Sequence, residues 1–283
     1  MIKDKCGEEL KMKKLFTAIF AIALSLVTLF SVTACTASGD VESVKKNKKI
    51  VVGVTDYAPF DYKDGNTWIG FDADMARLVA SDLGVDVEFQ LIEWEKKIIE
   101  LKSGKIDLIW NGMTKTDELA KEMDFSYSYA TNSQIAVIKN TNAQKYNNAE
   151  TMKDAKIVVE SKSAGETAAV EKFGEKNVTA LTSQVRALME VMSGTADVAI
   201  VDFSMASSLC GKGSYKDLVM VEAVKIGEEE FAVGARKGSD LVEKVNAVLV
   251  KAYKDGTMKT YQEKYGKNAD GSNSIALCDL SAK

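Results

Sequence analysis

The sequence contains no histidine. That absence excludes the Ser-His-Asp and Cys-His arrangements of nucleophilic catalysis and most zinc chemistry. Arginine is scarce, since it occurs only at Arg77, Arg186 and Arg236, and the one proline is Pro59. Basic residues are not in excess, because 37 lysines and arginines face 41 aspartates and glutamates and leave a net charge of −4. We therefore expect no nucleic-acid partner.

Apolar and charged residues occur in ordinary proportions. The chain has 283 residues, of which 46% are hydrophobic and 28% are charged. Such proportions are typical of a soluble globular protein, and the length is enough for one or two domains with a substantial core.

The N-terminal segment has the pattern of a secretory signal. Lysines precede an apolar run at residues 15–32, and small residues follow before Cys35. This order predicts a signal peptide over residues 1–34. A plain transmembrane anchor is the alternative, although the run is short and a polar segment follows it. We expect Met12 to be the true start, so that Cys6 is absent from the mature protein.

The end of this segment resembles a lipid-attachment motif. Residues 32–35, Val-Thr-Ala-Cys, resemble the lipobox of bacterial lipoproteins. The resemblance implies that Cys35 is acylated on its sulfur and becomes the N-terminus of the mature protein. Residues 35–48 are polar, with small side chains followed by lysines, and this composition predicts a flexible tether between a lipid anchor and a folded domain.

Strand and helix patterns alternate along the rest of the chain, and this alternation predicts an α/β fold with largely parallel sheets. The expected strands are residues 49–54, 85–92, 106–112, 133–140, 156–160, 178–181, 196–202 and 229–238. The expected helices are residues 70–84, 96–104, 116–123, 164–173, 183–194, 239–256 and 257–266. Two α/β units of similar size indicate two lobes with a cleft between them, beyond the carboxyl ends of the strands.

Four segments carry a family resemblance. Residues 52–84, 110–129, 193–202 and 231–266 resemble, in the same order, the polar amino-acid-binding proteins of ABC importers in their lipoprotein form. The resemblance implies a type II periplasmic-binding-protein-like fold, in which two lobes joined by two hinge strands close on one ligand.

The same resemblance implies where the lobes divide. Lobe 1 is expected at residues 49–135 plus 235–283, and lobe 2 at residues 136–234. The two hinges are expected near residues 134–139 and 231–236.

Asp202 is the residue expected to bind the ligand's ammonium group. It ends an apolar strand, and the resemblance assigns it this role, which a charge-assisted hydrogen bond would perform well. The alternative is that Asp202 caps the helix that begins near Phe203.

The resemblance places a carboxylate site at Ser163 and Ala164. Ser163 and Glu166 have the spacing of a capping box, and a capped helix start still offers free N–H groups to an anion. Lys162 stands where the family has a glycine.

Further ligand contacts are implied at Tyr57 and Trp94, at the segment Asn111, Gly112, Met113 and Thr114, and at Glu160. Core packing is the alternative for Trp94. For Glu160, an acid in the pocket wall favours a cationic or polar ligand side chain, and the alternative is a solvated carboxylate.

The position of the family's carboxylate-binding arginine is occupied by Leu119. A leucine cannot form the bidentate pair. Three explanations are open: Lys115 or backbone N–H groups near Thr114 and Ser163 replace it, Arg77 or Arg186 reaches the site, or the ligand has no conventional α-carboxylate.

After Cys35, cysteine occurs only at Cys210 and Cys278. An extracytoplasmic location permits a disulfide between them, and a bridge would tie the C-terminal segment to lobe 2.

The leading functional hypothesis is an extracytoplasmic receptor, lipid-anchored to the cell membrane, that delivers an amino acid or a close analogue to an ABC permease. We expect a monomer without catalytic residues, cofactor or metal. Two other functions stay open. One is a dehydratase-like enzyme on the same scaffold, with Glu160 and Asp202 as acid and base. The other is a ligand-sensing partner of a signalling protein.

Overall fold

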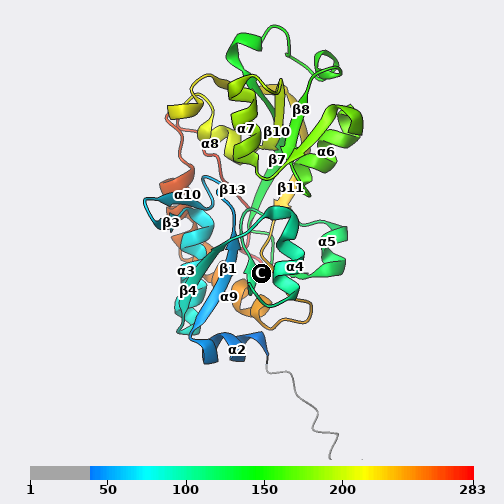
Figure 1. Ribbon diagram of the computed structural model, residues 1–283. Helices are drawn as coiled ribbons and strands as arrows, with labels where there is room; N and C mark the ends of the chain where they lie inside the picture. The colour runs from blue at the N-terminus through cyan, green and yellow to red at the C-terminus, as the bar shows by residue number, and fades with distance from the viewer. Residues whose placement is uncertain (1–38) are drawn as a thin grey trace, which may run out of the picture. The chain divides into compact units, whose positions relative to one another are not determined.

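The computed structural model describes residues 39–283, which form one compact unit with its own hydrophobic core (Figure 1). The predicted signal peptide and the lipid site at Cys35 lie outside the described residues. Within residues 39–283, no helix combines the length and the apolar character that a membrane crossing requires.

The first lobe is built on a five-stranded mixed sheet with the order β4-β1-β5-β12-β6. Strand β1 is parallel to β4 and β5, whereas β12 runs antiparallel to β5 and β6. The strands are β1 (Lys49–Val54), β4 (Asp86–Leu91), β5 (Leu108–Ile109), β6 (Asp124–Phe125) and β12 (Gly234–Ala235). The helices are α2 (Asp40–Asn47), α3 (Phe71–Leu83), α4 (Lys97–Lys102), α5 (Asp117–Glu122), α9 (Leu241–Lys254) and α10 (Thr257–Gly266).

Helix α2 occupies part of the predicted tether. Val44 of this helix is buried in the core of the first lobe. The Arg236 guanidinium lies 2.8 Å from an Asp40 carboxylate oxygen and 3.0 Å from one of Asp107. The tether prediction is therefore wrong over Asp40–Asn47, because a buried valine and a half-buried ion pair hold these residues against the lobe.

The second lobe contains a sheet with the order β11-β7-β10-β8-β9. Strand β8 is parallel to β9 and β10, whereas β7 is antiparallel to both β10 and β11. The strands are β7 (Ala130–Lys139), β8 (Ile157–Glu160), β9 (Val178–Leu181), β10 (Val198–Asp202) and β11 (Leu218–Phe231). The helices are α6 (Ala164–Phe173), α7 (Gln184–Ser193) and α8 (Phe203–Leu209).

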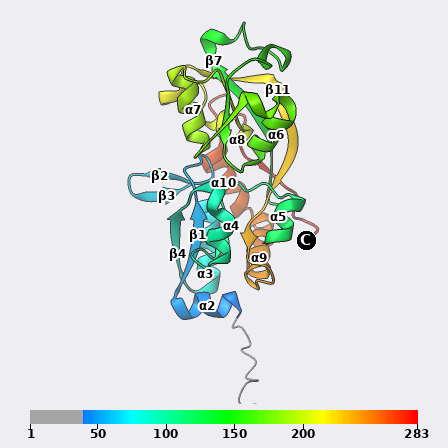
Figure 2. The same ribbon diagram turned by 45° about the vertical axis from the view of Figure 1, so that its right-hand side comes forward.

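Strands β7 and β11 connect the two lobes, and Figures 1 and 2 show both running between them. They pair from Leu218 with Lys139 to Phe231 with Ala130, with two register shifts. Residues 134–137 already pair with β10 inside the second sheet, and Gly234–Ala235 belongs to the first sheet. The expected hinge positions therefore need correction, since the connection itself lies near residues 130–133 and 227–231.

Most expected helices and strands are confirmed, including the glycine at position 84 that ends α3 in a left-handed conformation. The sequence did not predict helix α2, the hairpin of β2 (Tyr62–Asp64) and β3 (Thr67–Ile69), strand β6, most of the long strand β11, or β13 (Ala276–Leu277), which pairs with β7. Strand β11 lies at the sheet edge, where many exposed charged residues weaken the apolar pattern. Short 3-10 helices complete the fold at Trp94–Lys96, Asn140–Asn142, Glu150–Met152, Glu175–Asn177 and Gly213–Tyr215.

Candidate functional site

Asp202 lies at the carboxyl end of β10 and is 5% exposed. Its Oδ1 accepts hydrogen bonds from Asn132 Nδ2 at 2.6 Å and from Gln134 Nε2 at 2.7 Å, and its Oδ2 accepts one from Gln184. Its side chain makes no capping bond to the adjoining helix α8 in the described structure. The alternative role of Asp202 as a helix cap is therefore wrong, and its carboxylate is held by three neutral amides.

Glu229 is a second acid beside Asp202 and comes from β11. Its Oε2 accepts hydrogen bonds from Thr114 Oγ1 at 3.0 Å and from Asn132 Nδ2 at 3.1 Å. The same Asn132 amide also donates to Asp202. Burial, followed by the charge of Glu229, raises the pKa of Asp202 to about 7. Burial also raises the pKa of Glu229. A buried acid and a partly buried acid that share neutral donors favour a cation nearby, because a cation stabilises both ionised forms.

Glu160 ends β8, the strand next to β10, and is 4% exposed. Burial, followed by the charge of Asp202, raises the pKa of Glu160 to about 8. The alternative of a solvated Glu160 is therefore wrong. Across residues 39–283, no group of acidic or cysteine side chains is arranged to hold a metal ion.

Lys97 approaches these acids from the first lobe. Its side chain is buried, and its Nζ donates to the Trp94 carbonyl at 3.3 Å and to the Lys162 carbonyl of the second lobe at 2.9 Å. Burial lowers the pKa of Lys97 to about 8, while the charge of Glu160 acts in the opposite direction. Sequence reasoning missed this residue, which looks like one of many lysines on a short amphipathic helix.

Other hydrogen bonds also join the lobes. Tyr57 Oη lies 3.1 Å from Ser204 Oγ, and Ser161 Oγ donates to Glu95 at 3.1 Å. The expected site residue Tyr57 of the first lobe therefore faces the second lobe, and Thr114 contacts Glu229 in the connecting strand β11. The two lobes are in contact along the edge where β8 and β10 end.

Trp94 takes part in both packing and the site. It is 7% exposed and belongs to an apolar cluster of the first lobe that includes Leu101 and Met113. The Nζ of Lys97 lies 4.5 Å from the centre of the Trp94 ring. One face of the indole therefore supports a cation, while the rest of the ring packs in the core.

Asn111 and Met113 have roles inside the first lobe. Asn111 accepts from Thr55 Oγ1 at 2.6 Å and donates to Asp61 Oδ2 at 2.8 Å, and the side chain of Met113 is fully buried. The expectation that these two side chains bind ligand needs correction, because their hydrogen-bonding groups and surfaces are used within the lobe.

The backbone N–H of Gly112 is also hydrogen-bonded within the first lobe. Its N–H donates to Asp72 Oδ2 at 2.7 Å, and its φ is +56°. A Cβ at this position would collide with the ring of Tyr57. Gly112 therefore positions the site rather than donating its N–H to a ligand, which corrects the expected contact.

We expect Gly112→Ala to lower the free energy of unfolding by about 2–4 kcal/mol, because it combines a left-handed φ with a collision. Urea denaturation measures the loss. Gly104→Ala is the matched control, since Gly104 has φ +75° but no atom within 4 Å of an added Cβ. An equal loss in both variants would show that the collision with Tyr57 is relieved at no cost.

Ser163 caps helix α6 as expected. Its Oγ accepts from Glu166 N at 3.1 Å and donates to the Glu160 carbonyl at 2.7 Å. Glu166 bonds to the N–H of Lys162 instead of that of Ser163, so the capping box is displaced by one residue. Lys162 adopts φ +57°, which keeps the left-handed conformation that a glycine adopts readily. Ala164 is the first residue of helix α6 and directly follows this cap.

Leu119 provides no polar contact from its side chain and packs against the apolar cluster that contains Trp94. Arg77 is bound to Asp74 and to the Trp68 carbonyl, and Arg186 pairs with Glu190 at 2.7 Å. The explanation that Arg77 or Arg186 replaces the missing arginine is therefore wrong.

Cys210 and Cys278 are both free thiols in the described part of the chain. The possible bridge between them is therefore not formed. Burial raises the pKa of Cys210 to about 12 and that of Cys278 to about 11, so both thiols are weak nucleophiles at neutral pH.

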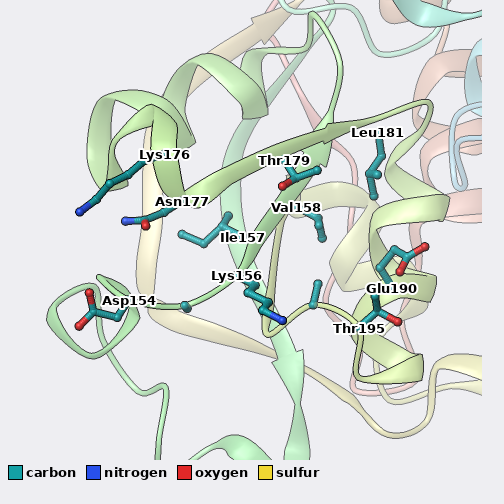
Figure 3. Close-up of a pocket in the computed structure, with 12 residues that line it drawn as sticks. Asp154, Lys156, Ile157, Val158, Lys176, Asn177, Thr179, Leu181, Glu190 and Thr195 are labelled. Atoms are coloured by element: carbon teal, nitrogen blue, oxygen red, sulfur yellow. The ribbon is translucent and has the colours of Figure 1, made fainter.

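A separate hollow of about 500 Å³ lies in the second lobe, and Figure 3 shows the side chains that line it. Ile157 and Thr179 place it at the amino ends of β8 and β9. Glu160 and Asp202 lie at the carboxyl ends of their strands, so this hollow is distinct from the candidate site.

Four further residues of the site were not expected from the sequence: Asn132, Gln134, Gln184 and Glu229. A signal existed for Gln134, which is a polar residue directly before the apolar run at residues 135–138 of its strand. The three amide side chains could not be recognised as site residues from the sequence. The carboxylates that they bond belong to Asp202 and Glu229, which come from other strands.

Curated relatives match most of the chain. The arginine-binding extracellular protein ArtP of Bacillus subtilis (strain 168) is 29% identical over 261 residues, which cover 90% of this chain and 98% of that protein. The L-cystine-binding protein TcyJ of Escherichia coli (strain K12) is 28% identical, with 86% of this chain and 92% of that protein covered.

Solved structures share the fold. An amino acid ABC transporter substrate-binding protein from Streptococcus pneumoniae, bound to L-arginine, is 30% identical with a TM-score of 0.75 and covers 80% of this chain and 97% of that one. The ancestral amino acid-binding protein AncCDT-1, a precursor of cyclohexadienyl dehydratase, is 33% identical with a TM-score of 0.73 and covers 80% and 99%. The expected type II periplasmic-binding fold is confirmed.

Residues 50–268 match the family described as bacterial extracellular solute-binding proteins, family 3. That match covers most of the chain and includes both lobes and the candidate site between them. The chain therefore belongs to the bacterial extracellular solute-binding proteins of family 3.

Proposed function

We propose that this protein binds one amino acid with a cationic side chain between its lobes and delivers it to the transmembrane subunits of an ABC importer. The observation that carries the cationic preference is the charge of the site. Two buried carboxyl groups, those of Glu160 and Asp202, and the partly buried Glu229 lie at the site together with one buried lysine, Lys97. A ligand with two cationic groups and one carboxylate complements this set.

Asp202 is the residue we assign to the ligand's α-ammonium group. Its carboxylate is oriented by amides from three neighbouring positions, and these neutral donors leave its charge uncompensated. A cationic ligand group would supply the missing charge in a site that excludes water, where such a hydrogen bond is strong. Glu160 or Glu229 would then receive the cationic side chain.

The hydrogen bonds between the lobes support a receptor that signals its occupancy by closing. Contacts such as that between Tyr57 and Ser204 exist only when the lobes approach each other. A ligand held by both lobes shifts the protein toward this closed form, which a permease can distinguish from an open one. We further propose that the protein acts outside the cytoplasm as a monomer, anchored through a lipid on Cys35.

The relatives support an amino acid as the ligand, but they differ in the amino acid for which they are named. ArtP of Bacillus subtilis is named for arginine, and the Streptococcus pneumoniae structure contains L-arginine. Other relatives are named for cystine and for glutamine. The cluster of acids is our reason for placing a cationic amino acid before these neutral ones.

Calorimetric titration tests this proposal. The chain from Thr36 onward is unfolded and refolded to remove bound ligand, and is then titrated with arginine, lysine, ornithine, histidine, glutamine and cystine. We expect one-to-one binding that is tightest for a cationic amino acid. Tightest binding of glutamine or cystine would contradict the cationic preference, and no binding of any amino acid would contradict the proposed function.

An enzyme on this scaffold is the second candidate, because one structural relative is a precursor of a dehydratase. Burial keeps Glu160 protonated near neutral pH, and such a group can act as a general acid. Incubation of the protein with a bound candidate substrate, followed by chromatography, separates the two functions. We expect the recovered compound to be unchanged.

A further inference from the structure

We propose that Lys97 is the cation that binds the ligand's α-carboxylate and thereby determines that the ligand is an amino acid rather than an amine. This inference rests on the proposed function, because it concerns the other end of the same ligand. No arginine of the described range reaches the cleft, and an α-carboxylate buried there without a cationic partner would weaken binding strongly.

The first observation is that Lys97 is a buried cation without a counter-ion. It is 3% exposed, yet both of its hydrogen-bond partners are neutral backbone carbonyls, those of Trp94 and Lys162. The ion pairs formed within residues 39–283 do not include Lys97. An ammonium group has three N–H bonds, so the two bonds to carbonyls leave one N–H for a ligand.

The second observation is that the other cationic side chains either form ion pairs elsewhere or are exposed. Arg236 is paired with Asp40 and Asp107 at the far side of the first lobe, and Arg186 is paired with Glu190. Lys115 is exposed, and Lys97 is the buried lysine of the described range. Lys97 is therefore the side chain that can offer a positive charge inside the cleft.

The third observation is the order of charges along the cleft. Glu160 and Asp202 end the neighbouring strands β8 and β10, and Lys97 donates to the carbonyl of Lys162, two residues after Glu160. A positive group next to acidic groups matches an α-amino acid, in which one carbon atom separates the carboxylate from the ammonium.

The fourth observation is the support beneath the lysine. Its Nζ lies 4.5 Å from the centre of the Trp94 ring and 2.9 Å from the Lys162 carbonyl oxygen of the second lobe. These contacts fix the ammonium at the boundary between the lobes. A carboxylate bound there touches a residue of the first lobe while the amino acid's ammonium touches Asp202 of the second.

A different role for Lys97 is a latch that holds the lobes together through the Lys162 carbonyl. A latch would stabilise the closed form for every ligand equally. The carboxylate role predicts a selective effect instead, so ligands with and without the carboxylate distinguish the two.

The experiment compares arginine with agmatine, its decarboxylated amine, in calorimetric titrations of the chain from Thr36 onward. The variants are Lys97→Met, which keeps length without charge, Lys97→Arg, and the control Lys96→Met. Lys96 is the preceding residue, and its exposed side chain pairs with Glu93 at 2.7 Å. Thermal unfolding of each variant checks that it is folded.

We expect Lys97→Met to weaken arginine binding about thirtyfold or more and agmatine binding less than about threefold. Lys97→Arg should keep most of the preference for arginine, because it keeps the charge, and Lys96→Met should change neither ligand. If the wild type prefers another amino acid, that amino acid and its decarboxylated amine form the pair.

Three results would overturn the inference. An equal loss for both ligands would assign Lys97 to closure, and no loss for either would place the carboxylate elsewhere. Wild-type binding of amines in preference to amino acids would mean that no α-carboxylate is bound. Failure of the proposed function is distinct, since the unmodified protein would then bind neither member of any pair.

Discussion

Replacing Asp202 by asparagine is expected to weaken binding of a cationic amino acid at least about a hundredfold, or ~2.7 kcal/mol. The buried carboxylate of Asp202 already has its neutral donors, and the ligand's ammonium would provide the opposite charge. Asparagine keeps the shape but removes that charge. Its amide also faces other amide N–H groups, which cannot accept a hydrogen bond from it.

The pH dependence of binding gives a second measure of this role. Because burial raises the pKa of Asp202 to about 7, ligand binding at pH 6 must first remove a proton. Wild-type affinity is therefore expected to rise from pH 6 to pH 8, and Asp202→Asn should flatten that rise.

Asp197→Asn is the matched control for this variant. Asp197 directly precedes the same strand at its opposite end, where it accepts from Lys156 N at 2.9 Å. Calorimetric titration should give wild-type affinity for Asp197→Asn. A loss below about threefold in Asp202→Asn would remove Asp202 from the ammonium site.

Replacing Asp61 by asparagine is expected to stabilise the protein at pH 8 by about 2 kcal/mol and to leave its stability nearly unchanged at pH 4. Asp61 and Asp72 are both fully buried in the first lobe. Asp72 accepts from Gly112 N and from the Tyr129 hydroxyl, each at 2.7 Å, whereas Asp61 accepts from Asn111 alone at 2.8 Å. Asp72 is therefore the better-stabilised anion, and Asp61 is the member that keeps a proton.

The sign of the effect follows from proton binding. Burial, followed by the charge of Asp72, raises the pKa of Asp61 well above its ordinary value. Between pH 4 and pH 8 the folded protein therefore holds a proton on Asp61 that the unfolded chain has released. Stability falls as pH rises through this range, by up to about 1.4 kcal/mol per pH unit for one such group. Asparagine is neutral in both states and removes that slope.

Urea denaturation at pH 4, 6 and 8 measures the difference between the two proteins. Raised pKa values also occur at Glu160, Asp202 and Glu229, and these groups change the stability of both proteins with pH in the same way. The difference in stability between wild type and variant therefore reports the pair of Asp61 and Asp72. Asp64→Asn is the control, because Asp64 is exposed on the nearby hairpin. Parallel pH profiles for wild type and Asp61→Asn would contradict the assignment of a trapped proton.

The sequence predicted the position of a site residue in the fold where that position depends on the residue's own helix or strand. Asp202 could be placed at the end of an apolar strand, and Ser163 at a helix start, because both signals are local. Asn111 and Met113 were assigned to the ligand because of the segment they belong to. Their side chains are instead buried within the first lobe, since neighbouring residues that are distant in sequence satisfy them.

The sequence by itself determined the α/β class, the order of most helices and strands, and the family. Hydrophobic periodicity and helix caps are local, so they can be recognised within one segment. The resemblance also spans both lobes, so family membership does not depend on any single residue.

The tertiary structure alone decided which polar groups meet. Gln134 lies 68 positions before Asp202, yet its amide donates to that carboxylate, because β7 and β10 are neighbours in the sheet. Glu229 joins them through β11, and Lys97 reaches Lys162 from the other lobe across 65 positions. The charge of the site is a sum over four separate segments, and only strand order and lobe contact bring those segments together.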